Sequence, residues 1–128
     1  MTVDRADISD APGLRALIGR LDELSALPED WDSYGGLPPT ARAIGAASRL
    51  IVEATTHAGD TPSAVMPFPN GGLQVIWERG QDELQVDVGP DGGLGYLAIH
   101  RGSSEPEMTE SDSISLADVL VLVEHLPR

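Results

Sequence analysis

Alternation of apolar and polar residues with a period of two is clearest between Pro67 and Arg101. Leucine, valine and tryptophan occupy every second position of two runs, Leu73–Glu78 and Glu83–Val88. Successive side chains of a β-strand point to opposite faces of the sheet, so each run predicts a strand with one apolar and one polar face. Turns rich in glycine separate these runs and precede a third apolar run that ends at Arg101. The stretch therefore predicts a three-stranded antiparallel meander.

A period of three to four residues replaces this alternation on both sides of the meander. It predicts one helix from Pro12 to before Pro28, a second over 41–56 and a third over 116–126. The valines of the third segment also permit a strand, because β-branched residues favour strands. The expected inner faces are formed by Leu14, Leu17, Ile18, Leu21 and Leu24, by Ile44, Ala47, Ser48, Ile51 and Thr55, and by Leu116, Val119, Leu120, Val123 and Leu126.

The remaining segments complete the expected architecture. Residues 1–10 are polar and are expected to fray, and residues 61–69, which contain three prolines, predict an edge strand or an irregular lead-in. Residues 102–113 hold few apolar groups and predict a mobile acidic loop. We therefore expect a single α+β domain over residues 1–128: a three- to four-stranded antiparallel β-meander packed against two N-terminal helices and one C-terminal helix.

Composition narrows the classes of function. The formal net charge of -13 argues against direct binding to a nucleic-acid backbone and favours a basic partner. The chain has no cysteine, which excludes disulfides and thiolate chemistry. It has no apolar run of roughly 20 residues, and its N-terminus lacks the pattern of a signal peptide. We therefore expect a cytoplasmic protein that does not contact a membrane.

Candidate chemistry is sparse. The histidines at 57, 100 and 125 are not spaced like metal ligands, and no nucleophile elbow or phosphate-binding loop is present. Arg79 and Arg101 stand at strand ends, where Glu78 and Asp82 are expected to neutralise them. We therefore expect no catalytic residues, no metal and no cofactor.

One loop concentrates aromatic residues in a chain that has few. Trp31 and Tyr34 lie three positions apart between the first two predicted helices, flanked by Asp30 and Asp32. Either the two rings anchor the loop to the core, or they form a binding surface. The first interpretation is favoured, because a core with so few aromatic residues needs its large side chains.

Two motifs occur together in a familiar order. The chain reads Trp31-Asp32-Ser33-Tyr34-Gly35 and later Pro69-Asn70-Gly71-Gly72 followed by Trp77. This order resembles a group of uncharacterised small bacterial and phage-borne proteins with a Trp-Asp-x-Tyr-Gly loop and a Pro-Asn/Asp-Gly-Gly-x-x-x-x-Trp hairpin. Small genes of this type often look like partners of a neighbouring gene product, so the resemblance implies an antitoxin-like or immunity-like role.

Together these features predict a non-enzymatic acidic protein-binding module, an antitoxin-like or immunity-like inhibitor or an accessory subunit of a basic protein. The alternatives are a nucleic-acid mimic that inhibits a DNA- or RNA-binding protein, and a small hydrolase that uses Asp30 or Asp32 with a histidine. A homodimer through the C-terminal helix is also expected. The candidate partner-binding residues are Trp31, Asp32, Tyr34, Glu78, Glu83, Asp87, Val121 and Leu122.

Overall fold

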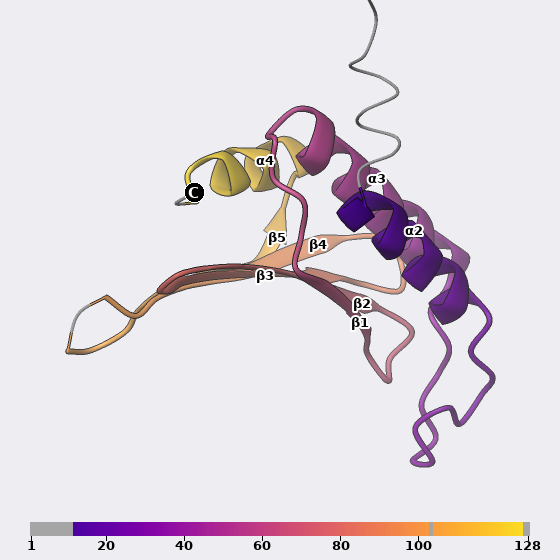
Figure 1. Ribbon diagram of the computed structural model, residues 1–128. Coiled ribbons are helices and arrows are strands. Elements are labelled where there is room, and N and C mark those ends of the chain that lie inside the picture. Colours follow the sequence, from indigo (N-terminus) through magenta and orange to yellow (C-terminus); the bar gives the residue numbers. More distant parts are fainter. Residues whose placement is uncertain (1–11, 103, 127–128) are drawn as a thin grey trace, which may run out of the picture.

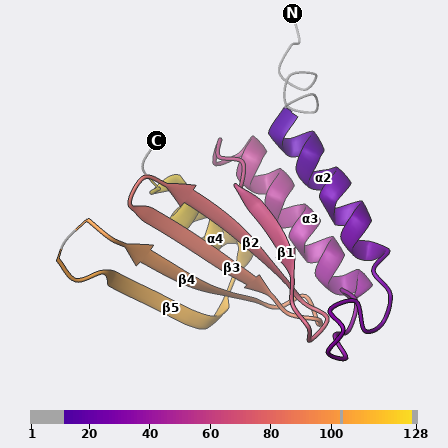
Figure 2. The same ribbon diagram turned by 60° about the horizontal axis from the view of Figure 1, so that its bottom comes forward.

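The computed structural model describes residues 12–102 and 104–126. The elements in this part of the chain are α2 (Pro12–Ser25), α3 (Ala41–Thr56), β1 (Ala64–Pro67), β2 (Leu73–Arg79), β3 (Asp82–Val88), β4 (Leu94–His100), β5 (Glu107–Ile114) and α4 (Leu116–Glu124). The strands form one antiparallel sheet in the order of the sequence, as Figure 2 shows. The predicted α+β class is confirmed, whereas the expected fraying of residues 1–10 lies outside the described residues.

The three described helices all cover the same face of the sheet, and Figure 1 shows the other face without a helix. The covered face carries the predicted apolar alternation of β2 and β3, and these side chains are almost completely buried. Each buried leucine or valine contributes roughly 1.5–3 kcal/mol to folding. Trp77 is fully buried at the centre of this layer, and its Nε1 donates a hydrogen bond to the backbone oxygen of Asp60 at 3.0 Å.

The inner faces of α2 and α4 follow the predicted periodicity, whereas the inner face of α3 is rotated about the helix axis relative to the prediction. The leucines of α2 and the valines Val119 and Val123 of α4 are buried as expected. In α3 the buried face is turned toward Ala43, Leu50 and Ala54, and Ser48 and Thr55 are only half-buried. Small alanine side chains let α3 approach the sheet closely, so the helix buries them in preference to the more polar edge of its stripe.

The expectation of a mobile loop over residues 102–113 is wrong for its second half. Glu107–Ile114 is a strand, β5, that pairs antiparallel with β4 through partners such as Leu97 and Glu110. Both faces of this edge strand are largely exposed, so it carries no apolar alternation. Its hydrogen bonds to β4, which sequence periodicity does not reveal, decide its conformation.

The proline-containing lead-in contains an edge strand, which is one of the two predicted alternatives. β1 pairs with β2 from Ala64 opposite Ile76 to Pro67 opposite Leu73. Proline cannot donate to a ladder of hydrogen bonds, so this segment can occupy only the outer edge of a sheet. With β1 and β5 at the two edges, the sheet has five strands in the described part of the chain, more than the three to four expected.

Candidate functional site

The uncovered face of the sheet, which we call the open face, carries three of the predicted partner-binding residues. Glu78 on β2 and Glu83 and Asp87 on β3 alternate with residues that are buried beneath the helices. Because alternate side chains point to opposite faces, all three carboxylates lie on the open face. Glu78 and Glu83 are direct partners across the two strands. Adjacent carboxylates repel each other, so they favour a basic group beside them.

Polar side chains on the open face form a connected network. The Nε2 of Gln74 donates to Oε1 of Gln85 at 3.2 Å and to Oδ1 of Asp87 at 3.1 Å. Gln85 in turn donates to one carboxylate oxygen of Glu83, and Arg101 pairs with the other at 3.1 Å. The hydrogen bond from Gln85 and the charge of Arg101 together lower the pKa of Glu83 from its ordinary value, although burial opposes them. Arg101 is therefore neutralised by Glu83 rather than by the expected neighbours.

Apolar residues share the open face with these acids. Ile76 and Ile99 are buried there, and Leu97 is half-buried. Met66 on β1 and Met108 on β5 are exposed, with Met108 retaining 63% of its accessible surface. Flexible methionine side chains on a mixed apolar and charged surface are typical of adaptable protein-binding faces. Alternation with Gln74 and Glu78 places Ile76 on this face, whereas the contribution of Leu97, Ile99 and Met108 depends on the register of β4 and β5.

A hollow of about 450 Å³ lies on the β3–β5 side of the open face. Gly95 has no side chain to fill it, and a Cβ atom at this position would come within 2.9 Å of the Ser111 backbone oxygen. The carboxylate-bearing residues Asp87, Glu110 and Asp112 line the hollow together with Leu97. Acidic groups around an open depression with an apolar wall can accept an arginine or lysine side chain of a partner.

The loop between α2 and α3 is a compact turn that projects from one end of the molecule (Figure 1). Oδ1 of Asp32 accepts the backbone N–H groups of Tyr34 at 2.9 Å and Gly36 at 2.8 Å. These hydrogen bonds lower the pKa of Asp32 from its ordinary value. A Cβ atom at position 36 would lie 2.7 Å from the Asp32 carboxylate, so a residue larger than glycine would displace this carboxylate from its present position.

The aromatic residues of this loop have different roles. Trp31 is half-buried, and its Nε1 donates to the backbone oxygen of Leu37 at 2.7 Å, which closes the loop on itself. Tyr34 is 92% exposed at the tip. The favoured interpretation, in which both rings anchor the loop to the core, is therefore wrong for Tyr34. The loop joins the sheet at the turn between β1 and β2, where the Leu37 N–H donates to the Pro69 oxygen at 2.8 Å.

The last helix carries the remaining predicted residues. Val121 keeps 49% of its accessible surface, whereas Leu122 is half-buried and packs against the core. The helix lies on the covered side of the sheet, so these residues do not join the open face (Figure 1). The eight predicted residues therefore do not form one surface: three lie on the open face, three in the aromatic loop and two on α4. None of the helices in the described part of the chain combines the length and apolar character needed to cross a membrane.

The hydrolase alternative required a histidine within hydrogen-bonding reach of the aromatic loop. His57 instead pairs with Glu53 at 3.1 Å, His100 pairs with Asp82 at 2.9 Å, and His125 contacts the Val121 oxygen. The loop carboxylates of Asp30 and Asp32 accept backbone N–H groups of their own turn. The described residues therefore do not assemble a carboxylate and a histidine at this loop. They also contain no cluster of three or more potential metal ligands.

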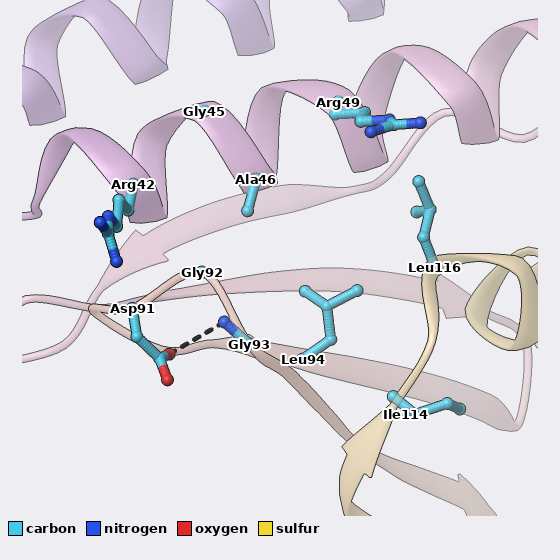
Figure 3. A pocket seen from close by; sticks show the side chains of 10 residues that line it. All are labelled: Arg42, Gly45, Ala46, Arg49, Asp91, Gly92, Gly93, Leu94, Ile114 and Leu116. Atoms are coloured by element: carbon cyan, nitrogen blue, oxygen red, sulfur yellow. Dashed lines mark hydrogen bonds between the residues drawn. The ribbon is translucent and has the colours of Figure 1, made fainter.

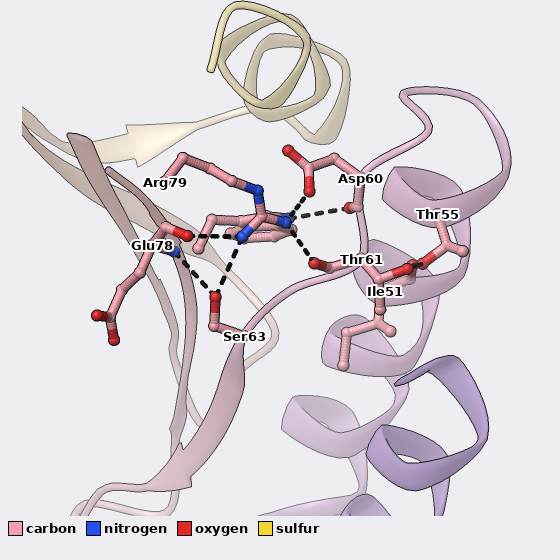
Figure 4. A network of polar contacts seen from close by, with 8 residues as sticks. Ile51, Thr55, Asp60, Thr61, Ser63, Glu78 and Arg79 are labelled. Atoms are coloured by element: carbon pink, nitrogen blue, oxygen red, sulfur yellow. Dashed lines mark hydrogen bonds and ion pairs between the residues drawn. The ribbon is translucent and has the colours of Figure 1, made fainter. Parts of the chain in front are cut away.

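Sequence reasoning missed a buried ion pair that joins β2 to the connection after α3. Asp60 is almost fully buried, and its Oδ1 accepts from Nη2 of Arg79. The guanidinium also donates to the Thr61 oxygen at 2.8 Å and to the Ser63 hydroxyl at 3.3 Å (Figure 4). Asp60 is therefore the carboxylate that neutralises Arg79, in place of the expected neighbours. No sequence signal marked this pair, because its members lie 19 positions apart.

Comparison of the chain with models of protein families, with curated proteins and with solved structures found no match. A functional proposal for this chain therefore rests on its own residues.

Proposed function

We propose that the chain is a non-enzymatic protein-binding module that receives a basic protein on the open face of its sheet. The observation that carries this proposal is the hollow beside Gly95, where Asp87, Glu110 and Asp112 surround an open depression next to Leu97. A basic side chain that enters the hollow would meet carboxylates and cover apolar surface at the same time. Both contributions are typical of the anchor residues of protein interfaces.

The surrounding surface supports a protein rather than a small substrate. The open face combines the polar network of Glu83, Gln85 and Gln74 with exposed methionines on both edges of the sheet. A mixture of apolar and polar groups spread over several strands suits an extended contact. The charge of -13 would also accelerate association with a basic partner at low ionic strength.

An inhibitor of the antitoxin or immunity type, or an accessory subunit, would act through such a surface by covering part of a basic protein. The nucleic-acid-mimic alternative needs carboxylates that follow one line like phosphates. The exposed acids instead extend over α2, the aromatic loop, the open face, β5 and α4. This distribution gives the mimic no support.

The test compares two double variants with equal changes in net charge. Asp87→Lys/Glu110→Lys reverses two carboxylates at the hollow, whereas Asp22→Lys/Glu124→Lys reverses two exposed acids on the helices. Each variant and the wild-type chain are used as bait in the cells that encode the protein, and retained proteins are identified by mass spectrometry. We expect the wild type and the helix variant to retain a basic protein. The hollow variant should not retain it.

Quantitative binding to the retained protein completes the test. We expect the hollow variant to weaken binding by at least tenfold, since each reversed carboxylate replaces an attraction by a repulsion. The wild-type affinity should fall as the NaCl concentration rises. Equal retention by all three baits, or an affinity that does not depend on salt, would contradict the proposal.

A further inference from the structure

A groove of about 550 Å³ lies on the covered side of the sheet, between α3 and the strands β4 and β5. Figure 3 shows α3 along one wall, the turn before β4 on the opposite wall and the start of α4 at one end. The volume is within the range of roughly 300–1,000 Å³ that small-molecule sites occupy. The groove adjoins the hollow of the open face at the turn before β4, because Asp91, Gly93 and Leu94 line both. Arg42, Arg49, Ala46, Ile114 and Leu116 line the groove and not the hollow.

Two arginines of α3 flank this groove. Arg42 and Arg49 are two helical turns apart, roughly 10 Å along the helix. Figure 3 shows Arg42 at the end near Asp91 and Arg49 at the end near Leu116. Their placement seven positions apart brings both side chains to the same side of α3.

The charges of these arginines are not matched by carboxylates. Elsewhere Arg20, Arg79 and Arg101 each pair with an acidic side chain. Within residues 12–102 and 104–126, neither Arg42 nor Arg49 takes part in an ion pair or a side-chain hydrogen bond. Asp91, the acid that lines the groove, directs its carboxylate to the N–H of Gly93 at 2.9 Å. Both arginines are exposed at the groove, so their guanidinium groups are available to an anionic ligand.

The floor between the arginines is apolar. Ala46, Leu94, Ile114 and Leu116 line it, and Gly45 leaves its part of the helix surface without a side chain. A Cβ atom added at Gly45 would meet no atom within 4 Å, so the groove is open at this point. A ligand that fits both the floor and the flanks therefore combines an apolar body with negative charge.

We propose that this groove binds a small organic anion of the carboxylate class, whose apolar chain lies on Ala46 and Leu94 and whose carboxylates contact Arg42 and Arg49. The net charge of -13 decides against an acidic peptide or a nucleic acid, because repulsion from the whole protein grows with the charge of the ligand. A ligand with one or two charges receives the local attraction of the arginines at a small long-range cost.

The test uses azelate, a linear dicarboxylate, and its uncharged diamide as a matched probe of similar length and apolar surface. Binding is followed by isothermal titration calorimetry and by the amide NMR shifts of Gly45 and Gly92, which line the groove and not the hollow. We expect saturable binding of azelate in the millimolar range, with binding of the diamide at least tenfold weaker. The shifts should be largest at the groove and absent from the open face.

Variants that each remove one positive charge distinguish binding in the groove from binding elsewhere on the surface. Arg42→Gln and Arg49→Gln should each weaken azelate binding about fivefold, since each removes one charge-assisted hydrogen bond. Arg20→Gln on α2 removes the same charge from an exposed arginine outside the groove and should change binding less than twofold. Circular dichroism confirms that each variant is folded.

Three results would overturn the inference: no saturable binding of azelate up to about 10 mM, equal affinity for the diamide, or equal weakening by Arg20→Gln. The inference does not rest on the proposed protein-binding function, because Arg42, Arg49 and Ala46 line the groove and not the hollow. The two proposals can therefore fail separately.

Discussion

Asp60 is the residue on which the connection between α3 and β1 depends. Its backbone oxygen accepts from Trp77, and its side chain pairs with Arg79. Its second carboxylate oxygen, Oδ2, is buried without a hydrogen-bond partner among the described residues. An unsatisfied buried oxygen costs about 1–3 kcal/mol, so the ion pair must stabilise the charge strongly for the arrangement to persist. This pair links β2 to the segment that leads into the edge strand β1.

We expect Asp60→Ala to lower the free energy of unfolding by about 3 kcal/mol, because it leaves the Arg79 guanidinium without its carboxylate. This loss is at the lower end of the range for buried ion pairs, because 24% of the Arg79 side-chain surface is accessible to solvent. Asp82 pairs with His100 and is more exposed than Asp60, so Asp82→Ala should lower the free energy of unfolding by less than about 1 kcal/mol. Urea unfolding followed by tryptophan fluorescence measures both. Equal effects of the two substitutions would remove the special role of Asp60.

The carboxylate of Asp32 holds the aromatic loop in its turn. Its charged form accepts the N–H groups of Tyr34 and Gly36, which lowers its pKa in the folded state. A carboxylate whose pKa is lowered by folding stabilises the fold at pH values above its pKa in the unfolded state, which is about 3.9 for aspartate. This contribution is lost as the pH falls through the pKa of the folded state.

We therefore expect the amide NMR signals of Tyr34 and Gly36 to titrate together, with a midpoint below about 3.9. In Asp32→Asn both titrations should disappear, because the amide does not ionise. The amide of Gly72 is a matched reference in the wild-type chain, since it donates to the side-chain oxygen of Asn70, which does not ionise. A midpoint at or above the ordinary aspartate value would show that the loop hydrogen bonds do not form in solution.

The helix α4 shows how one element divides its apolar residues between packing and exposure. Val119 and Val123 are fully buried, whereas Val121 on the outer side keeps about half of its surface. Ser115 caps the helix by accepting the Asp118 N–H at 3.1 Å, as its position before the apolar run suggests. The expected homodimer would use the outer side, because the inner side is occupied by the core.

Two substitutions by the same residue separate these roles. Val119→Glu should destabilise the fold by at least about 3 kcal/mol, since it buries an unpaired charge, whereas Val121→Glu should change stability by less than about 0.5 kcal/mol. If α4 mediates a homodimer, sedimentation velocity should show the wild type as a dimer and Val121→Glu as a folded monomer. A wild-type chain that sediments as a monomer would contradict the homodimer.

At the scale of the whole molecule, the hollow and the groove differ in local charge. The open face presents acids around the hollow beside Gly95, and the covered side contains the groove flanked by two arginines. The net charge of -13 nevertheless acts on the chain as a whole, because close packing brings like charges together on folding.

We expect the melting temperature to rise by about 2–5 °C when NaCl is increased from about 20 to about 300 mM, because salt screens this repulsion. The Asp22→Lys/Glu124→Lys variant carries less net negative charge and should show a smaller rise. Differential scanning calorimetry at pH 7 measures both chains. A melting temperature that is constant or falls with NaCl would show that self-repulsion does not limit stability.

The sequence by itself was sufficient wherever burial follows local periodicity. The leucines of α2, the alternating residues of β2 and β3 and the valines of α4 each face the core as their spacing predicts, because one buried face selects one register. The acids of the open face were predictable for the same reason, since they alternate with buried residues. The prolines around β1 likewise restricted that segment to an edge.

Only the tertiary structure decided the features that depend on residues distant in sequence. β5 is a strand because β4 supplies its hydrogen bonds, and neither of its own faces is buried enough to produce a pattern. The Asp60–Arg79 pair and the groove between Arg42 and Arg49 arise where separate elements meet, so local spacing cannot reveal them. Tyr34 is exposed because its loop closes on itself through Trp31 and Asp32 rather than on the core. Periodicity reports which side of an element is buried, whereas contacts between elements decide what the exposed sides form together.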